Sequence, residues 1–451
     1  MENNNKSSLL VGPDDKVGMG EAGFLGLQHV LAMDIYVPPI VLAGMMAMGL
    51  GDQMGLLQST FLAAGIGTIL QTFVFMKMPV SQGPSFVPLG AAAGVALASG
   101  GLKGSGMANL IGALLIGSII LIILGATGLF QKIINRLVPA LVGGTIITCV
   151  GLSLIPTALN DNIFNAAGKV NNNIILASVT ALTLLISVGI SFKFPKVRRF
   201  FRTGSIILAL GVGTVVSTMM GVFDWKEVNN AAWFGLPERT IFHWGINFNA
   251  SAIITFIIIY AVITTETTGT WFAMGAVTNH KITNKQWNRG IIGEGLSCMV
   301  AALLGTTPVT GYSTNAGVIS ITGVASKRVF LFAGIWFSVL GFFSKLSAFL
   351  AAIPAPVIGG VFAIITVTIM LNGLNVIRGL ETTDRDLYII GIPIVLTLAL
   401  VLLPTSASKN APQILQYLLG SPIAVAAIAA IILNLVMPKT KPAIKAETET
   451  A

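Results

Sequence analysis

Three acidic residues stand inside long apolar segments of the chain: Asp34, Glu266 and Glu294. An ionisable side chain inside a membrane span costs about 2.5–3.5 kcal/mol on insertion scales, so each acid predicts a function or a polar partner. Glu266 lies within Tyr260–Thr270, where threonines and a glycine leave room for a ligand. Its carboxylate can accept hydrogen bonds from the N–H edge of a heterocycle, or take up and release a proton. The alternative is a structural glutamate that is tied to a neighbouring helix.

Two segments that contain several glycines and prolines are predicted to shape a polar pocket. They are residues 79–86 and 308–315, and neither suits a continuous helix that faces lipid. A helix that starts near Thr314 or Asn315 would direct its free N–H groups toward the middle of the membrane. We expect the ring of Phe86 to stack on a planar ligand. The polar residues expected in this pocket are Ser85, Tyr312, Ser313, Thr314 and Asn315. Helix capping without a ligand is the alternative for Ser85, Thr314 and Asn315.

Further polar residues are candidates for proton coupling or for supporting Glu266. His29 follows Gln28 in the first apolar segment and predicts either a packing hydrogen bond or a functional role. Glu294 can accept hydrogen bonds from the start of the tenth apolar segment, relay protons, or hold the structure together. Asp34 is predicted near the middle of the first span, as a proton-linked site or as the partner of another helix. The full candidate set is Glu266, Glu294, His29, Asp34, Gln28 and Thr270.

The composition predicts that helices in a lipid bilayer position these residues. The chain has 451 residues, of which 54% are hydrophobic and 10% charged, whereas soluble domains carry about 25% charged residues. Apolar runs such as 107–128 and 174–192 have the length of about 20 residues that crosses a bilayer as a helix. The net charge of +9 fits basic loops that orient a membrane protein, so no nucleic-acid partner is predicted.

Other residue types exclude further classes of protein. Cys149 and Cys298 both lie in apolar segments, so no disulfide framework is expected. His29, His243 and His280 are scattered, so we predict no metal site and disfavour a membrane enzyme. The polar start of the chain precedes a long first span, and no removable signal peptide is expected.

Fourteen apolar segments can be counted along the chain. They start near Phe24, Leu56, Pro79, Met107, Leu137, Ile174, Gly204, Ala250, Arg289, Thr306, Val329, Ile353, Leu387 and Ser421. With the N-terminus in the cytoplasm, only six basic residues fall outside: Lys103, Lys169, Lys226, Arg239, Lys345 and Lys409. The other 20 of the 26 lie on the inner side, which predicts that both termini are cytoplasmic.

Two pairs of similar stretches predict an internal duplication. Residues 79–81 (Pro-Val-Ser) resemble residues 308–310 (Pro-Val-Thr), 229 positions later. Residues 141–145 resemble residues 357–361, 216 positions later. Spans one to seven would then match spans eight to fourteen, and because seven is odd the second copy must be inverted. Paired broken segments in inverted repeats are the best sequence indication of a transporter's binding site.

Several of these motifs together resemble the nucleobase–ascorbate transporter family. They are Gln28-His29, Ser85-Phe86, Glu266-Thr-Thr-Gly269 and Asn315-x-Gly317-x-x-x-x-Thr322-Gly323. The resemblance extends over about residues 18–437. It implies an all-α polytopic fold with fourteen spans in two inverted seven-span repeats, and short antiparallel strands in spans three and ten. It also implies homodimers in which a core domain moves against a gate domain.

The resemblance implies the domain boundaries as well. The core (transport) domain is expected at residues 24–130 and 250–350, and the gate domain at residues 131–249 and 351–437. Residues 1–23 and 438–451 are expected to be cytoplasmic tails.

Residue by residue, the resemblance assigns roles to the candidate side chains. Glu266 resembles the principal substrate carboxylate, and Phe86 the ring that stacks on the base. Asn315 is similar to the family's signature asparagine beside the site, His29 to the first-span histidine, and Glu294 to the acid of span nine that supports transport. Two positions depart from the family pattern. Thr314 replaces a glutamine or glutamate that contacts the base, and Thr270 replaces an Asp or His partner of the glutamate.

These expectations combine into a bacterial inner-membrane symporter that imports a purine nucleobase with protons. The purine class considered is xanthine, hypoxanthine, guanine and urate. Buried acids favour the proton over sodium as the coupling ion, and no cofactor is expected. A uracil:proton symporter is the first alternative, because the preference for purines depends only on Thr314 and Glu294. An anion exchanger of the related inverted-repeat fold is the second, although the carboxylate of Glu266 would repel anions.

Overall fold

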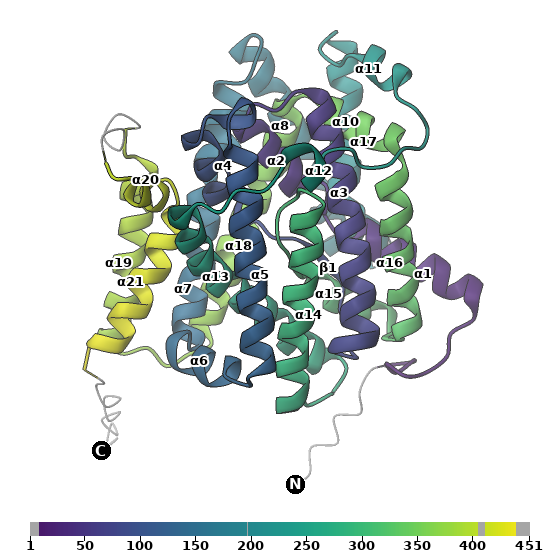
Figure 1. Cartoon of the computed structure of the whole chain (residues 1–451). Coiled ribbons are helices and arrows are strands. Elements are labelled where there is room, and N and C mark those ends of the chain that lie inside the picture. The colour runs from purple at the N-terminus through teal and green to yellow at the C-terminus, as the bar shows by residue number, and fades with distance from the viewer. Residues whose placement is uncertain (1–8, 196, 405–410, 439–451) are drawn as a thin grey trace, which may run out of the picture.

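The computed structural model describes residues 9–195, 197–404 and 411–438, and 74% of the protein is helical (Figure 1). The first half contains α1 (Met19–Leu31), α2 (Val37–Met45), α3 (Leu50–Ile69), η1 (Leu70–Phe75), α4 (Leu89–Ala98), η2 (Gly101–Lys103), α5 (Gly106–Ala126), α6 (Phe130–Leu137), α7 (Ala140–Pro156), η3 (Thr157–Phe164), α8 (Val170–Lys193), α9 (Arg198–Thr203) and α10 (Ser205–Met219). The second half contains α11 (Trp225–Asn230), α12 (Ile241–Trp244), α13 (Ala250–Val277), α14 (Asn284–Leu303), α15 (Thr314–Thr322), α16 (Lys327–Phe342), α17 (Ser344–Ala352), α18 (Ala355–Arg378), α19 (Asp384–Val401), α20 (Gln413–Leu419) and α21 (Pro422–Val436).

Six of the described helices are long and apolar enough to cross a membrane. These helical stretches are Leu50–Phe75, Gly106–Ala126, Ala140–Phe164, Val170–Lys193, Ala250–Val277 and Ala355–Arg378. A seventh candidate is the pair α16 and α17, which is bent by 76°. Other predicted spans fall on shorter apolar helices such as α4, α10 and α21. The protein is therefore a multi-pass helical membrane protein.

The first predicted span is not one continuous helix, which corrects the sequence-based expectation. α1 ends at Leu31, α2 begins at Val37, and Asp34 lies in the break between them. Pro38 and Pro39 stand in the first turn of α2, where proline is tolerated because its missing N–H has no intrahelical acceptor there. The Val37 N–H bonds the Asp34 carbonyl oxygen at 2.9 Å and closes the turn.

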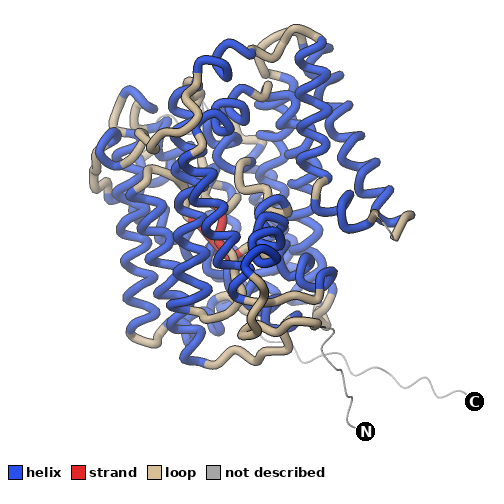
Figure 2. Tube along the Cα trace, turned by 90° about the vertical axis from the view of Figure 1, so that its right-hand side faces the viewer, coloured by secondary structure: helices blue, strands red, loops and turns tan. Residues whose placement is uncertain are grey.

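A two-stranded antiparallel sheet lies in the middle of the helices (Figure 2). β1 (Gln82–Pro84) pairs with β2 (Val309–Gly311), and Gly83 lies opposite Thr310. All six strand residues are buried. Strand pairing satisfies backbone groups that neither broken segment can satisfy by itself inside a membrane. It also holds together two segments from opposite halves of the chain.

The long helices form two packing groups. In one group α5 packs against α14, and α3 against α16, while α1 also contacts α16. In the other group α18 packs against α7 and α8, and α19 packs against α7 and α21. α13 contacts both groups, through α5 on one side and through α7 and α21 on the other.

The contact of α3 with α16 requires a residue without a side chain at position 65. A Cβ built on Gly65 would lie 2.4 Å from Ser338 Oγ and 2.6 Å from the Gly334 carbonyl oxygen. We therefore expect Gly65→Val to lower the free energy of unfolding by about 1–3 kcal/mol or more, because the two helices must separate. The measurement is the melting temperature of the detergent-purified protein. Gly189→Val in α8 is the control, since nothing lies within 4 Å of its Cβ position. Equal melting temperatures for the two variants would contradict this packing.

Candidate functional site

Glu266 and Ser85 form the centre of the candidate site. Glu266 lies on α13, which contacts β2 and α15, and Ser85 directly follows β1. The Ser85 hydroxyl donates to Glu266 Oε2 at 2.6 Å, and Ser85 is fully buried while Glu266 is half-buried. No described residue donates a hydrogen bond to Glu266 Oε1. One carboxylate oxygen is thus anchored by the protein, and the other is open to the N–H group of a ligand.

α15 packs against α13, the helix that carries Glu266. α15 begins at Thr314, as predicted, and Ser313 is its N-cap residue. Ser313 and Thr314 are exposed, whereas Tyr312 is half-buried and its hydroxyl donates to the Pro84 carbonyl oxygen at 2.9 Å. The Tyr312 ring lies 2.7 Å from the Cβ position of Gly83 in β1. The structure therefore brings Tyr312 next to β1 and leaves the hydroxyls of Ser313 and Thr314 accessible from outside.

Phe86, which follows Ser85, packs against α18. Its ring is 8% exposed and stacks on Phe362 of α18, with centroids 5.9 Å apart and an interplanar angle of 17°. Phe86 neighbours Ser85 and hence Glu266. Phe362 covers one face of the Phe86 ring, and a ligand that stacks on this face must displace Phe362. The stacking of Phe86 on a base stays a prediction.

Asn315 lies in the interior of the protein. It is fully buried, and its Oδ1 accepts a hydrogen bond from His29 Nδ1 at 2.8 Å. Its amide group donates to Met33 Sδ at 3.1 Å and to Ser81 Oγ. Asn315 thus joins α1, the segment before β1 and the start of α15. It supplies the polar partner expected for His29, and its direct contact with a substrate stays a prediction.

The pairing of His29 with Asn315 can be tested by a double-mutant cycle. We expect His29→Ala and Asn315→Ala each to lower the melting temperature, since each leaves a buried polar group without its partner. The double variant should be less destabilised than the sum of both, by about 0.5–3 kcal/mol. Strictly additive losses would contradict a direct interaction.

Glu294 is held by groups from three other elements. It is fully buried on α14, where Oε2 accepts from Gln71 Nε2 at 3.2 Å and from Gln82 Nε2 at 3.0 Å. Its Oε1 accepts a hydrogen bond from the Thr267 hydroxyl. Thr267 is also hydrogen-bonded to the Thr310 hydroxyl at 2.6 Å and to the Gly311 N–H at 3.0 Å. The carboxylate of Glu294 therefore connects α14 with η1, β1, α13 and, through Thr267, β2.

The remaining predicted site residues occupy different positions. The Thr270 hydroxyl donates to the Gly311 carbonyl oxygen at 2.8 Å, so this buried residue supports β2. Gln28 is half-buried on α1. Asp34 is half-buried in the break between α1 and α2, and the side chain of the next residue, Ile35, lies 3.2 Å from the Cβ position of Gly83 in β1. Gln71, Gln82 and Thr267 were missed by the sequence interpretation, although a glutamine in an apolar segment is a detectable signal.

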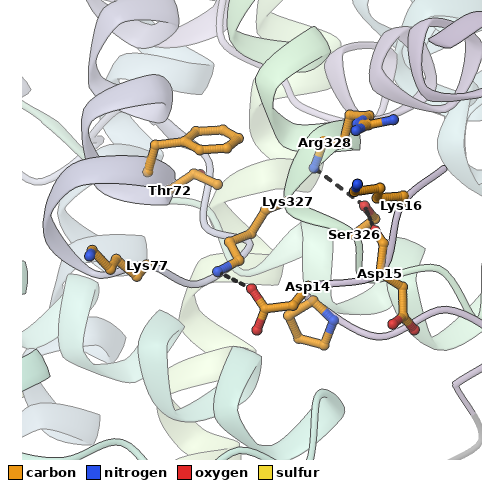
Figure 3. A pocket seen from close by; sticks show the side chains of 10 residues that line it. Asp14, Asp15, Lys16, Thr72, Lys77, Ser326, Lys327 and Arg328 are labelled. Carbon is orange, nitrogen blue, oxygen red and sulfur yellow. Dashed lines mark hydrogen bonds and ion pairs between the residues drawn. The ribbon is translucent and has the colours of Figure 1, made fainter. Parts of the chain in front are cut away.

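A cavity of about 370 Å³ lies away from these residues, between the N-terminal segment, η1 and the start of α16 (Figure 3). Lys327 Nζ pairs there with the Asp14 carboxylate at 2.5 Å, and Lys16, Lys77 and Arg328 also line it. None of its lining residues is a predicted site residue. Within the described residues, no group of three or more His, Cys, Asp or Glu residues is arranged to hold a metal ion.

Comparison with known families identifies what kind of protein carries this site. Residues 20–406 match the model of the Permease family, which corresponds to the nucleobase–ascorbate transporters. The chain belongs to this family. It is therefore a membrane transport protein and not an enzyme.

Curated relatives match almost the whole chain. A candidate purine permease of Clostridium perfringens is 30% identical, over 97% of this chain and 95% of its own length. The xanthine permease of Bacillus subtilis is 27% identical, over 96% of this chain and 97% of its own length. The uric acid permease PucK of Bacillus subtilis is 28% identical, over 91% of this chain and 94% of its own length.

Solved structures share the fold at low sequence identity. The transmembrane domain of the cyanobacterial bicarbonate transporter BicA has a TM-score of 0.58 at 16% identity, covering 87% of this chain and 98% of that domain. SLC26A9 has a TM-score of 0.54 at 14% identity, covering 88% of this chain and 65% of that protein. These similarities show a fold of the inverted-repeat type.

Proposed function

We propose that the permease imports a purine nucleobase across a bacterial inner membrane together with protons. The observation that carries this proposal is the Glu266 carboxylate, which Ser85 anchors through one oxygen and leaves open at the other. An open carboxylate oxygen next to an exposed helix start accepts N–H groups of a planar heterocycle. The xanthine, uric acid and purine permeases among the relatives support this substrate class.

The proposed roles of the site residues follow their positions. Glu266 binds the base and shares in proton coupling, while Thr314, Ser313 and Tyr312 shape the pocket and Phe86 stacks on the base. His29, Asn315, Glu294 and Thr270 hold the broken segments in place. Half-buried acids that reach a ligand site are the groups that can carry a proton with the substrate, which favours H⁺ over Na⁺.

The arrangement in the membrane is part of the proposal. We propose fourteen spans in two inverted repeats, an even number that puts both termini on the same side, and the described chain begins and ends on one side (Figure 1). The excess of basic residues on that side assigns it to the cytoplasm. We assign residues 24–130 and 250–350 to the core domain, and residues 131–249 and 351–437 to the gate domain. The two packing groups of helices support this division, with Phe86 and Phe362 in contact across it. We propose a homodimer as the assembled form.

A competition experiment tests the substrate class. Cells without purine and uracil uptake of their own would express the chain and take up radiolabelled hypoxanthine. We expect unlabelled purines to abolish this uptake and uracil to have little effect. Uracil uptake that purines do not displace would overturn the purine assignment. Absence of any nucleobase uptake by correctly localised protein would overturn the nucleobase assignment itself.

Anion exchange has weaker support, although the solved structures with this fold include a bicarbonate transporter. At 16% identity that similarity concerns the fold alone. The half-buried carboxylates of Glu266 and Asp34 disfavour an anion at this position, because like charges repel strongly where water is scarce.

A further inference from the structure

Asp34 occupies a position in the fold that the family resemblance does not explain. It lies in the break between α1 and α2, and both of its neighbours are packed against the candidate site. Met33 Sδ accepts a hydrogen bond from Asn315, and the Ile35 side chain lies 3.2 Å from the Cβ position of Gly83 in β1. Met33 and Ile35 are almost completely buried, whereas Asp34 keeps part of its surface accessible.

The chain around Asp34 packs beside the candidate site. The Tyr312 ring lies 2.7 Å from the Cβ position of Gly83 in β1, so Tyr312 and Ile35, the residue after Asp34, pack on the same glycine. The Asp34 backbone carbonyl oxygen accepts a hydrogen bond from the Val37 N–H, whereas no described side chain donates to the Asp34 carboxylate. A polar group at such depth normally has a partner. Asp34 therefore resembles Glu266 in having acceptor capacity that the protein leaves unused.

The residues around these two acids add no positive charge. Ser85, Tyr312, Ser313 and Thr314 are neutral, and no described Lys or Arg forms an ion pair with Asp34 or Glu266. Even with one proton held between the two carboxyl groups, the pair carries a negative charge. Such a site has two sets of acceptors and an unfavourable potential for anions.

We propose that Asp34 is a second substrate-binding residue, which together with Glu266 selects neutral purines that carry N–H donors on both rings and rejects the urate anion. This inference rests on the proposed function and narrows it. Guanine and hypoxanthine are neutral at physiological pH and present N–H groups on the six- and five-membered rings. One carboxylate binds the six-membered ring edge, and the other binds the five-membered ring N–H. Urate has comparable N–H groups but is an anion at that pH, so the negative charge of the two carboxyl groups disfavours its binding.

Competition for hypoxanthine uptake tests this selectivity. In cells that express the wild-type chain, we expect guanine to inhibit radiolabelled hypoxanthine uptake at concentrations at least about tenfold lower than urate requires. In Asp34→Asn we expect guanine to inhibit more weakly and urate more strongly, so that the ratio of their inhibition constants falls about tenfold or more. Asp161→Asn, an exposed acid of η3 outside the site, is the matched control and should keep the wild-type ratio.

The outcomes separate this inference from the proposed function. Equal inhibition of the wild type by urate and guanine would overturn the role of Asp34, while nucleobase transport itself would stand. If Asp34→Asn weakens the inhibition by guanine and by urate equally, so that the ratio of their inhibition constants stays at the wild-type value, the role of Asp34 would also be overturned. If fluorescence-detected gel filtration shows that Asp34→Asn does not fold and reach the membrane, two other measurements test the inference. They are the ratio of the urate and guanine inhibition constants in the wild type and the same ratio in Asp34→Glu. Asp34→Glu should retain exclusion of urate.

Discussion

Glu266→Gln is expected to reduce purine uptake about 100-fold while the protein still folds and reaches the membrane. The amide retains the size of the side chain and can still accept the Ser85 hydroxyl through its remaining oxygen. Its other polar group becomes an NH₂ donor that faces the N–H edge of the base. A charge-assisted hydrogen bond of about 1.5–3 kcal/mol is lost, and the side chain can no longer take up a proton.

Initial uptake rates of radiolabelled hypoxanthine, normalised to the amount of folded protein, measure this effect. Glu227→Gln is the control, because Glu227 is exposed on the short helix α11 and lies outside the site. Its uptake should equal that of the wild type. A Glu266→Gln variant that transports at the wild-type rate would show that this carboxylate neither binds the base nor couples protons.

Glu294→Ala should act mainly on stability. The change removes the acceptor of the Gln82 amide and the Thr267 hydroxyl, and one of two acceptors of the Gln71 amide, which also donates to the Gly290 carbonyl oxygen. Buried donors that lose their acceptor cost about 1–3 kcal/mol each, so we expect a loss of about 3 kcal/mol and a clearly lower melting temperature. Glu294→Gln should be milder because its remaining oxygen still accepts one of these donors.

Thermal unfolding of the detergent-purified variants, measured by tryptophan fluorescence, distinguishes the two glutamates. Glu266→Gln should melt close to the wild type and fail to transport, whereas Glu294→Ala should melt early. A Glu294→Ala protein with wild-type melting and no transport would contradict the structural role and favour a proton relay instead.

The sequence alone pointed to candidate site residues but not to the residues that contact them in the fold. Glu266, Ser85 and the start of α15 at Thr314 could be found because an acid, a broken segment and a helix start are local features. Glu294 is hydrogen-bonded to Gln71 and Gln82, which are more than 200 residues away in the sequence. No local sequence pattern specifies such contacts. The stacking of Phe86 on Phe362 is likewise a tertiary contact between two distant segments.

The three-dimensional structure adds contacts that the sequence could not specify. Asn315 was expected to contact the substrate, and its amide is hydrogen-bonded to His29, Met33 and Ser81. Asp34 was predicted near the middle of the first span, and in the structure the helix of this segment is interrupted at Asp34, before two prolines. Hydropathy indicates which residues are buried in lipid or protein. It does not indicate where a buried segment leaves the helical conformation, so the break could not be located from it.

Transport by the purified chain in proteoliposomes tests the central proposal most directly. Liposomes that contain only this protein would be given an inwardly directed proton gradient in sodium-free buffer, and the accumulation of radiolabelled hypoxanthine would be followed. We predict accumulation above equilibrium, which collapses when a protonophore is added and is absent with Glu266→Gln. Accumulation that requires a sodium gradient, or no transport of any nucleobase by folded protein, would contradict the account.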